Sequence, residues 1–321
     1  MERAAPRLPS SLNLLSPGLK PMSRSLVLGK SKLYWKNVFE GYAFISLWIV
    51  GFVVFTAGAL LGSFSISLTK WNIVGTPEFI GLENYQKMLE DEFFWQSLKV
   101  TIIFLLNVPL NLALGLFLAM LLNQKIRLIG FFRTLFYLPS VTAGVAVSLL
   151  WMWIFNPRFG VINVMLKGIG IKGPAWLGSE TWALPALIVM SVWGVGGGML
   201  IYLGALQGIP TTFYEAATLD GANAFQKFRR ITVPMITPVL LLNLIMGIIG
   251  SFQVFTQAFI MTNGGPNYAT LFYVLYLYQN AFQWFNMGYA SALAWVLFLV
   301  ILAFTFLILR TSSSWVYYEG G

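Results

Sequence analysis

Charged residues along this chain come in groups, and long uncharged, apolar runs separate one group from the next. A helix needs about 20 apolar residues to cross the hydrocarbon core of a membrane. Four of the runs have room for one crossing each, and the last run, between Arg230 and Arg310, has room for more than one. The pattern predicts membrane-spanning helices over residues 42–68, 100–122, 135–154, 184–206, 239–260 and 289–309.

The last run contains a break that decides between six and seven spans. Residues 263–267 combine asparagine, two glycines and proline, which is a strong turn signal. Residues 273–287 then mix aromatic side chains with four amides, Gln279, Asn280, Gln283 and Asn286. This segment is too polar to face lipid, so we expect it at the membrane interface or facing a pore. The prediction is an all-α integral membrane protein of about six spans.

The composition agrees with a membrane protein and excludes several kinds of chemistry. Soluble domains carry about 25% charged residues, whereas this chain has 10%, with 58% hydrophobic residues and a mean hydropathy of +0.75. It contains no cysteine and no histidine. Thiol nucleophiles, thiolate metal sites, disulfides and imidazole acid–base catalysis are therefore excluded. We expect no catalytic residues and no metal site.

The distribution of lysine and arginine predicts the orientation. Cytoplasmic segments of membrane proteins are enriched in these residues. With a cytoplasmic N-terminus, fourteen of the 20 basic residues fall on the cytoplasmic side, and the first external segment is acidic. The net charge of +9 then reflects topology and not nucleic-acid binding. We predict a cytoplasmic tail over 1–41, a transmembrane domain over 42–310 and a cytoplasmic tail over 311–321.

One cytoplasmic loop, residues 209–235, has the pattern of two short helices outside the membrane. Thr212 and Glu215 have the spacing of a capping box for the first helix. Asp220 and Gly221 form a turn signal, and Asp220 is placed to cap the second helix. Pro234 is expected to end that helix, because proline disfavours helix at the preceding residue. A compact hairpin of this kind predicts a docking site for a cytoplasmic partner.

The same loop resembles that of a known family. Glu215-Ala216-Ala217, Asp220-Gly221-Ala222 and Ile231-x-x-Pro234 are similar to the EAA loop of permease subunits in binding-protein-dependent ABC importers. The resemblance implies a type I importer permease fold, in which this loop sits in a cleft of the ATPase. It assigns ATPase coupling to Glu215, Ala216, Ala217, Asp220, Gly221 and Pro234, with Glu215 as the polar contact.

Further segments resemble the carbohydrate branch of that family, which includes the larger maltose permease and the glycerol-phosphate permease. They are residues 79–85, 133–139, 264–266 and 287–292. The implied partners are a second homologous permease, two ATPase subunits, an extracytoplasmic solute-binding protein and membrane lipid. The implied substrate is a sugar, with an oligosaccharide favoured and a glycerol-phosphate type as the alternative.

No nucleotide-binding motif is present in the chain itself. Gly29-Lys30-Ser31 ends like a phosphate-binding loop, but the motif requires a glycine at position 24, where the chain has Arg24. We therefore expect no cofactor on this chain, with ATP and Mg²⁺ bound by the partner ATPase subunits.

Polar residues inside the predicted spans are all uncharged, which favours a neutral substrate over an ion-coupled carrier or a phosphate. Within the fifth span, residues recur at helical spacing and should share one face. The alternative is that the amides hold neighbouring helices together. The candidate pathway residues are Asn107, Asn111, Asn243, Gly247, Gly250, Gln253 and Gln257.

Two functions from other classes remain open on the sequence. A secondary carrier or channel would work without an ATPase, and co-purification with an ATPase chain discriminates it from an importer subunit. A membrane scaffold or receptor would bind partners without transport, which the resemblance of the 209–235 loop disfavours.

Overall fold

The computed structural model describes residues 32–124 and 127–317. The chain divides into two compact units, Met1–Leu60 and Leu61–Gly321. The described part of the first unit is helical, and the Gly29-Lys30-Ser31 segment and most of the predicted 1–41 tail lie outside the described residues. Its elements are α1 (Lys32–Gly51), the π-helix η1 (Phe52–Ala57) and the start of α2 (Gly58–Ser67).

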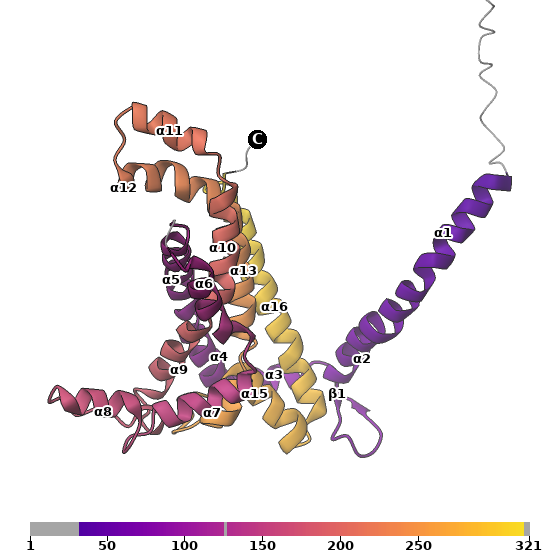
Figure 1. The fold of residues 1–321 in the computed structure, drawn as a ribbon. Helices are drawn as coiled ribbons and strands as arrows, with labels where there is room; N and C mark the ends of the chain where they lie inside the picture. The colour runs from indigo at the N-terminus through magenta and orange to yellow at the C-terminus, as the bar shows by residue number, and fades with distance from the viewer. Residues whose placement is uncertain (1–31, 125–126, 318–321) are drawn as a thin grey trace, which may run out of the picture. The chain divides into compact units, whose positions relative to one another are not determined.

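The second unit begins with an antiparallel hairpin of strands β1 (Thr69–Lys70) and β2 (Glu78–Phe79), in which Thr69 pairs with Phe79. Helices make up most of the remainder (Figure 1). The first group is α3 (Glu83–Glu90), α4 (Glu92–Phe104), α5 (Asn107–Leu122), α6 (Ile129–Tyr137), the 3₁₀ turn η2 (Leu138–Val141), α7 (Gly144–Ile154) and α8 (Val161–Gly168).

The second group contains the helices around the candidate site. It is made of η3 (Trp176–Gly178), α9 (Ala183–Ser191), η4 (Val192–Gly194), α10 (Gly196–Gly208), α11 (Thr211–Leu219), α12 (Ala224–Lys227), the π-helix η5 (Phe228–Thr232), α13 (Val233–Phe252), α14 (Thr256–Met261), α15 (Tyr273–Tyr278), the π-helix η6 (Gln279–Gln283) and α16 (Met287–Ser312).

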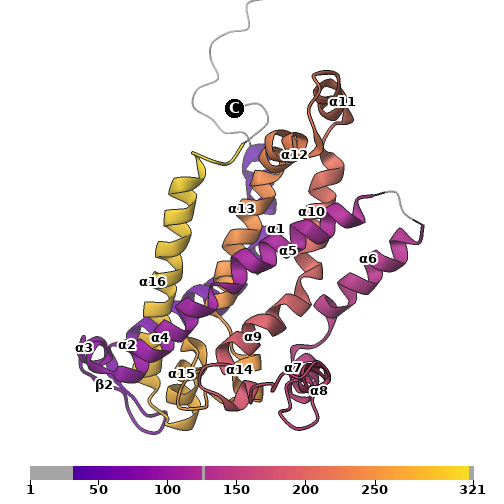
Figure 2. The same ribbon diagram turned by 90° about the vertical axis from the view of Figure 1, so that its left-hand side faces the viewer.

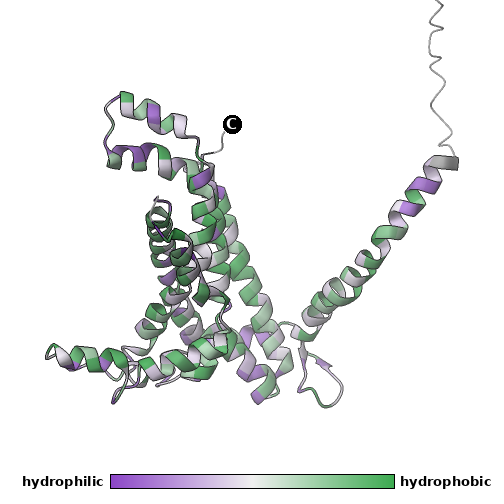
Figure 3. Cartoon of the chain, in the orientation of Figure 1, coloured by the Kyte–Doolittle hydropathy of each residue, from purple (hydrophilic) through white to green (hydrophobic). Residues whose placement is uncertain are grey.

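Within the described residues, four helices are long and apolar enough to cross a membrane: Tyr34–Ser67, Glu92–Leu122, Ala224–Met261 and Met287–Ser312. Two bent pairs raise the number to as many as six if each pair is one span. With each bent pair counted as one span, the prediction of about six spans is confirmed. Figure 3 shows apolar residues covering most of α13 and α16, as lipid-facing helices require.

The third predicted span, residues 135–154, is not the single helix that was expected. Ile129–Val141 and Gly144–Ile154 meet at an angle of 98°. Thr142 and Ala143 have extended ψ angles of 138° and 130°, so the chain turns a corner between η2 and α7. The fourth span bends by 45° between η4 and α10. Hydropathy records how apolar a segment is, but not its direction, which is why the bends were missed.

The bend before α10 allows a close contact with α6. A Cβ atom built on Gly196 would lie 2.0 Å from the carbonyl oxygen of Phe136. Only glycine permits this approach, because any side chain would overlap the backbone of the neighbouring helix. The position of α10, which lines the candidate site, therefore depends on Gly196.

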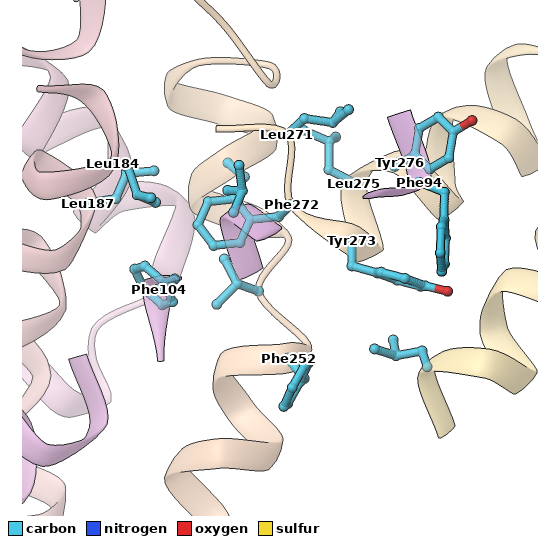
Figure 4. Close-up of a cluster of buried hydrophobic side chains, with 14 of the residues drawn as sticks. Phe94, Phe104, Leu184, Leu187, Phe252, Leu271, Phe272, Tyr273, Leu275 and Tyr276 are labelled. Atoms are coloured by element: carbon cyan, nitrogen blue, oxygen red, sulfur yellow. The ribbon is translucent and has the colours of Figure 1, made fainter. Parts of the chain in front are cut away.

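The main core lies where α4, α9, α13, α15 and α16 meet, at the end of the second unit opposite α11 (Figures 1 and 4). Phe104 and Phe272 pack edge to face, with ring centroids 5.0 Å apart. The fully buried residues around them include Leu187, Phe252, Leu271, Tyr273 and Leu275. This core holds the ends of these helices in one block.

The segment 273–287 was predicted to lie at an interface or a pore, and its first half is instead buried. Tyr273 and Leu275 have no exposed surface, and Asn280 is 3% exposed. The polar groups are satisfied inside the protein: the Tyr273 hydroxyl donates to the Leu293 carbonyl at 2.9 Å, and its backbone N–H donates to Thr101 Oγ1 at 3.0 Å. Buried hydrogen bonds thus allow a polar segment to pack inside the helix bundle.

Asp91 joins three elements of this core. One carboxylate oxygen accepts from the Phe93 backbone N–H at 2.9 Å and caps α4. The other accepts from the hydroxyls of Tyr276 and Tyr289, which belong to α15 and α16. Burial, together with the hydrogen bond to Asp91, raises the pKa of Tyr276, so its hydroxyl remains a donor.

Replacement of Gly196 by alanine tests the contact between α6 and α10. We expect Gly196→Ala to lower the free energy of unfolding by about 1–3 kcal/mol, because the added methyl group must displace the Phe136 carbonyl. Thermal unfolding of the purified protein in detergent measures the effect.

Gly204→Ala is the matched control, because a Cβ atom at Gly204 in the same helix meets nothing within 4 Å. We expect this variant to be as stable as the parent protein or more stable by up to about 1 kcal/mol. Equal losses in both variants would contradict the close contact at Gly196.

Candidate functional site

Residues 209–235 form a hairpin of two helices at one end of the second unit (Figure 1). The first helix, α11, ends at Leu219, and Gly221 follows with a φ of 76°. The Ala222 N–H donates to the Ala217 carbonyl at 2.9 Å, which closes the end of α11. The tight turn expected at Gly221 is therefore present, and it requires a residue that tolerates a positive φ.

The helix caps differ from the prediction. Pro210 precedes α11 without a side-chain cap, so Thr212 and Glu215 do not form a capping box. The second helix is capped by Asn223 and not by Asp220: Asn223 Oδ1 accepts from the Gln226 N–H at 2.9 Å, and Gln226 Oε1 accepts from the Asn223 N–H at 2.8 Å. The turn at Gly221 lengthens the connection and moves the start of the helix beyond Asp220. Glu215 is consequently not used to build the hairpin.

Pro234 does not end the second helix as predicted. α12, η5 and α13 follow one another without a break from Ala224 to Phe252. The wider π-helical turn η5 precedes Pro234, which occupies the first turn of α13, where the missing N–H is tolerated. The hairpin is thus directly continuous with a membrane-spanning helix.

Hydrogen bonds between side chains fasten the two arms of the hairpin. The hydroxyls of Tyr214 and Thr232 lie 3.0 Å apart. Lys227 Nζ donates to Thr218 Oγ1 at 2.8 Å, and Thr218 Oγ1 donates to the Tyr214 carbonyl at 2.6 Å. Lys227, one of the basic residues of the loop, is therefore an internal contact of the hairpin. The two arms should move together.

The outer surface of the hairpin presents a carboxylate and large apolar side chains. Glu215 is exposed, and no hydrogen bond or ion pair to it occurs among the described residues. Phe213, Leu219 and Phe225 are 44%, 90% and 68% exposed. Ala216, Ala217 and Asp220 lie on the same hairpin, and their short side chains let a partner approach its backbone. An exposed apolar surface with charged groups around it is typical of a protein-binding site.

A second hydrophobic cluster connects the hairpin to the membrane helices. Tyr214 and Ile231 of the hairpin pack against buried residues of α5, α10 and α13. The buried members are Ala119, Leu122, Met199, Tyr202, Leu203, Leu206, Ile209 and Ile236. Movement of the hairpin must therefore displace these helices, since a close-packed cluster transmits strain.

A cavity of about 360 Å³ lies among α5, α9, α10 and α13. Figure 2 shows α5 crossing α10 and α13, with α9 leading into α10. The lining of the cavity is neutral, with amide, hydroxyl and glycine residues between aliphatic side chains. The residues that line it are Asn107, Val108, Asn111, Leu112, Ser191, Gly194, Val195, Gly198, Tyr202, Asn243, Met246 and Gly247.

Four of the seven candidate pathway residues meet in this cavity: Asn107, Asn111, Asn243 and Gly247. The other three do not line it. Gly250 is exposed, Gln253 lines a separate apolar cavity beside α15 and α16, and Gln257 lies in α14. The expected stripe is interrupted because α13 ends at Phe252, so the helical spacing does not continue through Gln253.

The amides also hold helices together, so the alternative interpretation applies in part. Asn107 Nδ2 donates to Ser251 Oγ of α13 at 2.9 Å, and Asn111 Nδ2 lies 3.2 Å from Ser191 Oγ of α9. Asn243 differs, because its Nδ2 donates at 2.9 Å to the Val239 carbonyl of its own helix. Asn243 is thus a cavity residue whose side-chain hydrogen bond stays within its own helix, α13.

Tyr202 connects the cavity and the hydrophobic cluster under the hairpin, and the sequence analysis missed it. Its ring packs against Gly115, where an added Cβ would lie 3.1 Å away, and its side chain belongs to both groups of residues. Its buried hydroxyl has no hydrogen-bond partner among the described residues. A buried hydroxyl without a partner beside a cavity can bond a molecule that enters it.

Comparisons with known proteins identify related sequences. The model of the family described as "Binding-protein-dependent transport system inner membrane component" matches residues 111–316. The probable ABC transporter permease protein YesP of Bacillus subtilis is 45% identical over 90% of this chain and 96% of its own length. The trehalose/maltose transport system permease protein MalF of Thermococcus litoralis is 33% identical over 87% of this chain and 96% of its own.

A solved structure shares the fold. It is the bacterial alginate ABC transporter in complex with an alginate pentasaccharide-bound periplasmic protein, and one of its chains matches with a TM-score of 0.78. The sequences are 23% identical, and the match covers 88% of this chain and 97% of that one. The type I importer permease fold implied by the resemblance is therefore confirmed.

Proposed function

Because this chain belongs to the family of binding-protein-dependent transport system inner membrane components, we propose that it is one of two permeases that form the pathway of an ATP-driven sugar importer. Family members are the transport permeases of ABC importers, and separate subunits hydrolyse the ATP. The chain is a multi-pass membrane protein and not an enzyme.

The hairpin of α11 and α12 is the proposed contact with the ATPase. Its exposed apolar residues and Glu215 suit a protein partner, and its Lys227–Thr218 and Tyr214–Thr232 contacts make it one rigid body. Closure of an ATPase dimer around the hairpin would move α13 directly, because η5 joins α12 to α13 without a break. This continuity is the observation that carries the proposal.

The neutral cavity is the proposed part of the pathway that contacts substrate. Sugars present hydroxyl groups, and the amides of Asn111 and Asn243 and the unpartnered hydroxyl of Tyr202 can bond them without charge. Its lining contains no cationic side chain to hold a phosphate, which favours a sugar over a glycerol-phosphate type. Relatives named for trehalose, maltose and lactose transport support a sugar, and we propose an oligosaccharide.

The proposed orientation places the hairpin and both chain termini in the cytoplasm. Most of the basic residues then lie on the cytoplasmic side, as the positive-inside rule requires. The proposed complex contains a second homologous permease, two ATPase subunits that bind ATP and Mg²⁺, and an extracytoplasmic solute-binding protein. Alternating access follows if the hairpin, α10 and α13 move as one body about the cavity.

Removal of the Glu215 carboxylate tests the contact with the ATPase. In the reconstituted complex, we expect Glu215→Ala to lower ATP hydrolysis stimulated by binding protein and sugar by roughly tenfold or more, since a hydrogen bond to a charged group contributes about 1.5–3 kcal/mol. Steady-state ATPase rates with and without sugar measure the loss.

Glu90→Ala is the control, because Glu90 is also an exposed carboxylate but lies at the opposite end of the second unit. It should leave the stimulated rate unchanged. The assignment of Glu215 fails if Glu215→Ala keeps full stimulation, or if no ATPase chain co-purifies with the permease.

Asn243→Leu tests the cavity. This change removes a polar group from the cavity but no hydrogen bond to another helix, so the fold should survive. We expect sugar uptake into proteoliposomes at low sugar concentration to fall by roughly two- to tenfold, because one neutral hydrogen bond contributes about 0.5–1.5 kcal/mol. Gln253→Leu makes the same chemical change in a separate cavity and should leave uptake intact. Equal uptake by both variants and the parent would contradict the proposed pathway.

A further inference from the structure

The helices α7 and α8 form an arm that is turned away from the spans. α7 lies at 98° to the preceding helical segment, and Figure 1 shows α7 and α8 running across the direction of α10, α13 and α16. The arm lies at the end of the second unit opposite the α11–α12 hairpin (Figure 1). A helix with this direction at the end of a membrane bundle lies along the membrane surface.

The loop that carries α8 is built around one buried amide. Asn163 is 9% exposed, and its Nδ2 donates to the carbonyls of Pro157 at 3.1 Å and Pro174 at 3.0 Å. Its Oδ1 accepts from Trp176 Nε1 at 2.7 Å. Gly173 packs directly on this amide, because an added Cβ would lie 2.0 Å from Asn163 Oδ1. The shape of the loop is therefore fixed from inside.

This loop encloses a cationic cavity of about 590 Å³. Arg158, Lys167 and Lys172 line it, and no carboxylate is among its lining residues. None of the three forms an ion pair within the described part of the chain, where Lys36 and Glu40 form the pair found. The cavity therefore collects positive charge that the protein itself does not neutralise.

The whole of this membrane side carries six basic residues. The three that lie outside the cavity share other cavities with acidic groups. Lys70 and Lys87 line one cavity with Glu83, and Lys99 lines another with Glu92 and Glu180. The positive-inside rule does not explain cations on the side opposite the hairpin. Because Arg158, Lys167 and Lys172 are concentrated on one rigid loop, we expect the loop to bind an anionic ligand.

Large apolar side chains are exposed beside these cations. Val164, Met165, Ile169 and Ile171 are 58%, 67%, 72% and 51% exposed, and Figure 3 shows apolar positions along α8. Apolar side chains next to lysine and arginine on a helix that lies along the membrane are typical of interfacial lipid binding. The apolar groups enter the acyl region while the cations remain at the level of the phosphates.

We propose that this cavity binds the phosphate of an anionic phospholipid, in the leaflet opposite the hairpin. Arg158, Lys167 and Lys172 contact the headgroup, and the exposed apolar residues of α8 and of the turn that follows it contact the acyl chains. The bound lipid anchors the arm, and thereby α7 and the helix α14 that packs against it. The proposal rests on the membrane-spanning role proposed above, but not on the identity of the transported sugar.

Native mass spectrometry of the full chain with its co-purifying subunits tests this site. Phosphatidylglycerol and phosphatidylcholine are titrated separately in detergent, and bound lipid is counted. The parent protein should bind phosphatidylglycerol more tightly, with an affinity that falls as salt rises. The variant Arg158→Gln/Lys167→Gln/Lys172→Gln should lose roughly fivefold in affinity for each charge removed. Lys70→Gln/Lys99→Gln removes charge elsewhere on the same side and should bind like the parent.

Other outcomes overturn the proposal. Equal binding of the two lipids, or unchanged phosphatidylglycerol binding by the triple variant, excludes an anionic-lipid site. Inorganic phosphate that displaces the lipid at equal concentration assigns the cavity to free phosphate. Weaker binding of the solute-binding protein with unchanged lipid binding assigns the arm to a protein partner. Sugar uptake by the same samples is measured separately, so failure of the lipid site is distinguishable from failure of the transport function.

Discussion

The hydrocarbon core of a membrane offers no hydrogen-bond partner, so the chain itself must satisfy every polar group that it places there. The neutral amides and hydroxyls of this protein follow that constraint. Asn107 bonds Ser251 across two helices, Thr101 accepts from the backbone of Tyr273, and Asn111 reaches Ser191. These bonds set the positions of α4, α5, α9, α13 and α15. The candidate cavity is the place where the same kind of polar group remains available, at Tyr202 and Asn243.

The hairpin and the cavity, which are the two candidate sites, are supported by the same helices. α10 and α13 both line the cavity and both contribute to the cluster against which Tyr214 and Ile231 of the hairpin pack. Tyr202 belongs to the cavity and to that cluster. A force on the hairpin therefore reaches the cavity through close-packed side chains and through α12, η5 and α13, which are continuous from Ala224 to Phe252. The segment after α16 also contacts this helix near the start of α13, because the Tyr317 N–H donates to Thr237 Oγ1 at 2.8 Å.

Much of the fold could be predicted from the sequence, because the spacing of charges reports directly on membrane crossings. The hairpin was predicted from its residue pattern, and so was the turn at Gly221. The errors arose where three-dimensional packing overrides local rules. Pro234 is tolerated after a π-helical turn, and the polar segment after Phe272 is buried because Leu293 and Thr101 bond it. Only part of the cavity was found, since Ser191 and Tyr202 reach it through a bend that hydropathy does not record.

The central claim is that the hairpin contacts an ATPase and moves the helices that line the cavity. A photo-reactive benzoylphenylalanine at Leu219, which is 90% exposed, tests it most directly in membranes that import sugar. The account predicts a cross-linked adduct with the ATPase subunit from Leu219, and none from the same probe at Ile169, which is 72% exposed at the opposite end. An importing complex that gives the adduct from Ile169, or no adduct from Leu219, would contradict the account.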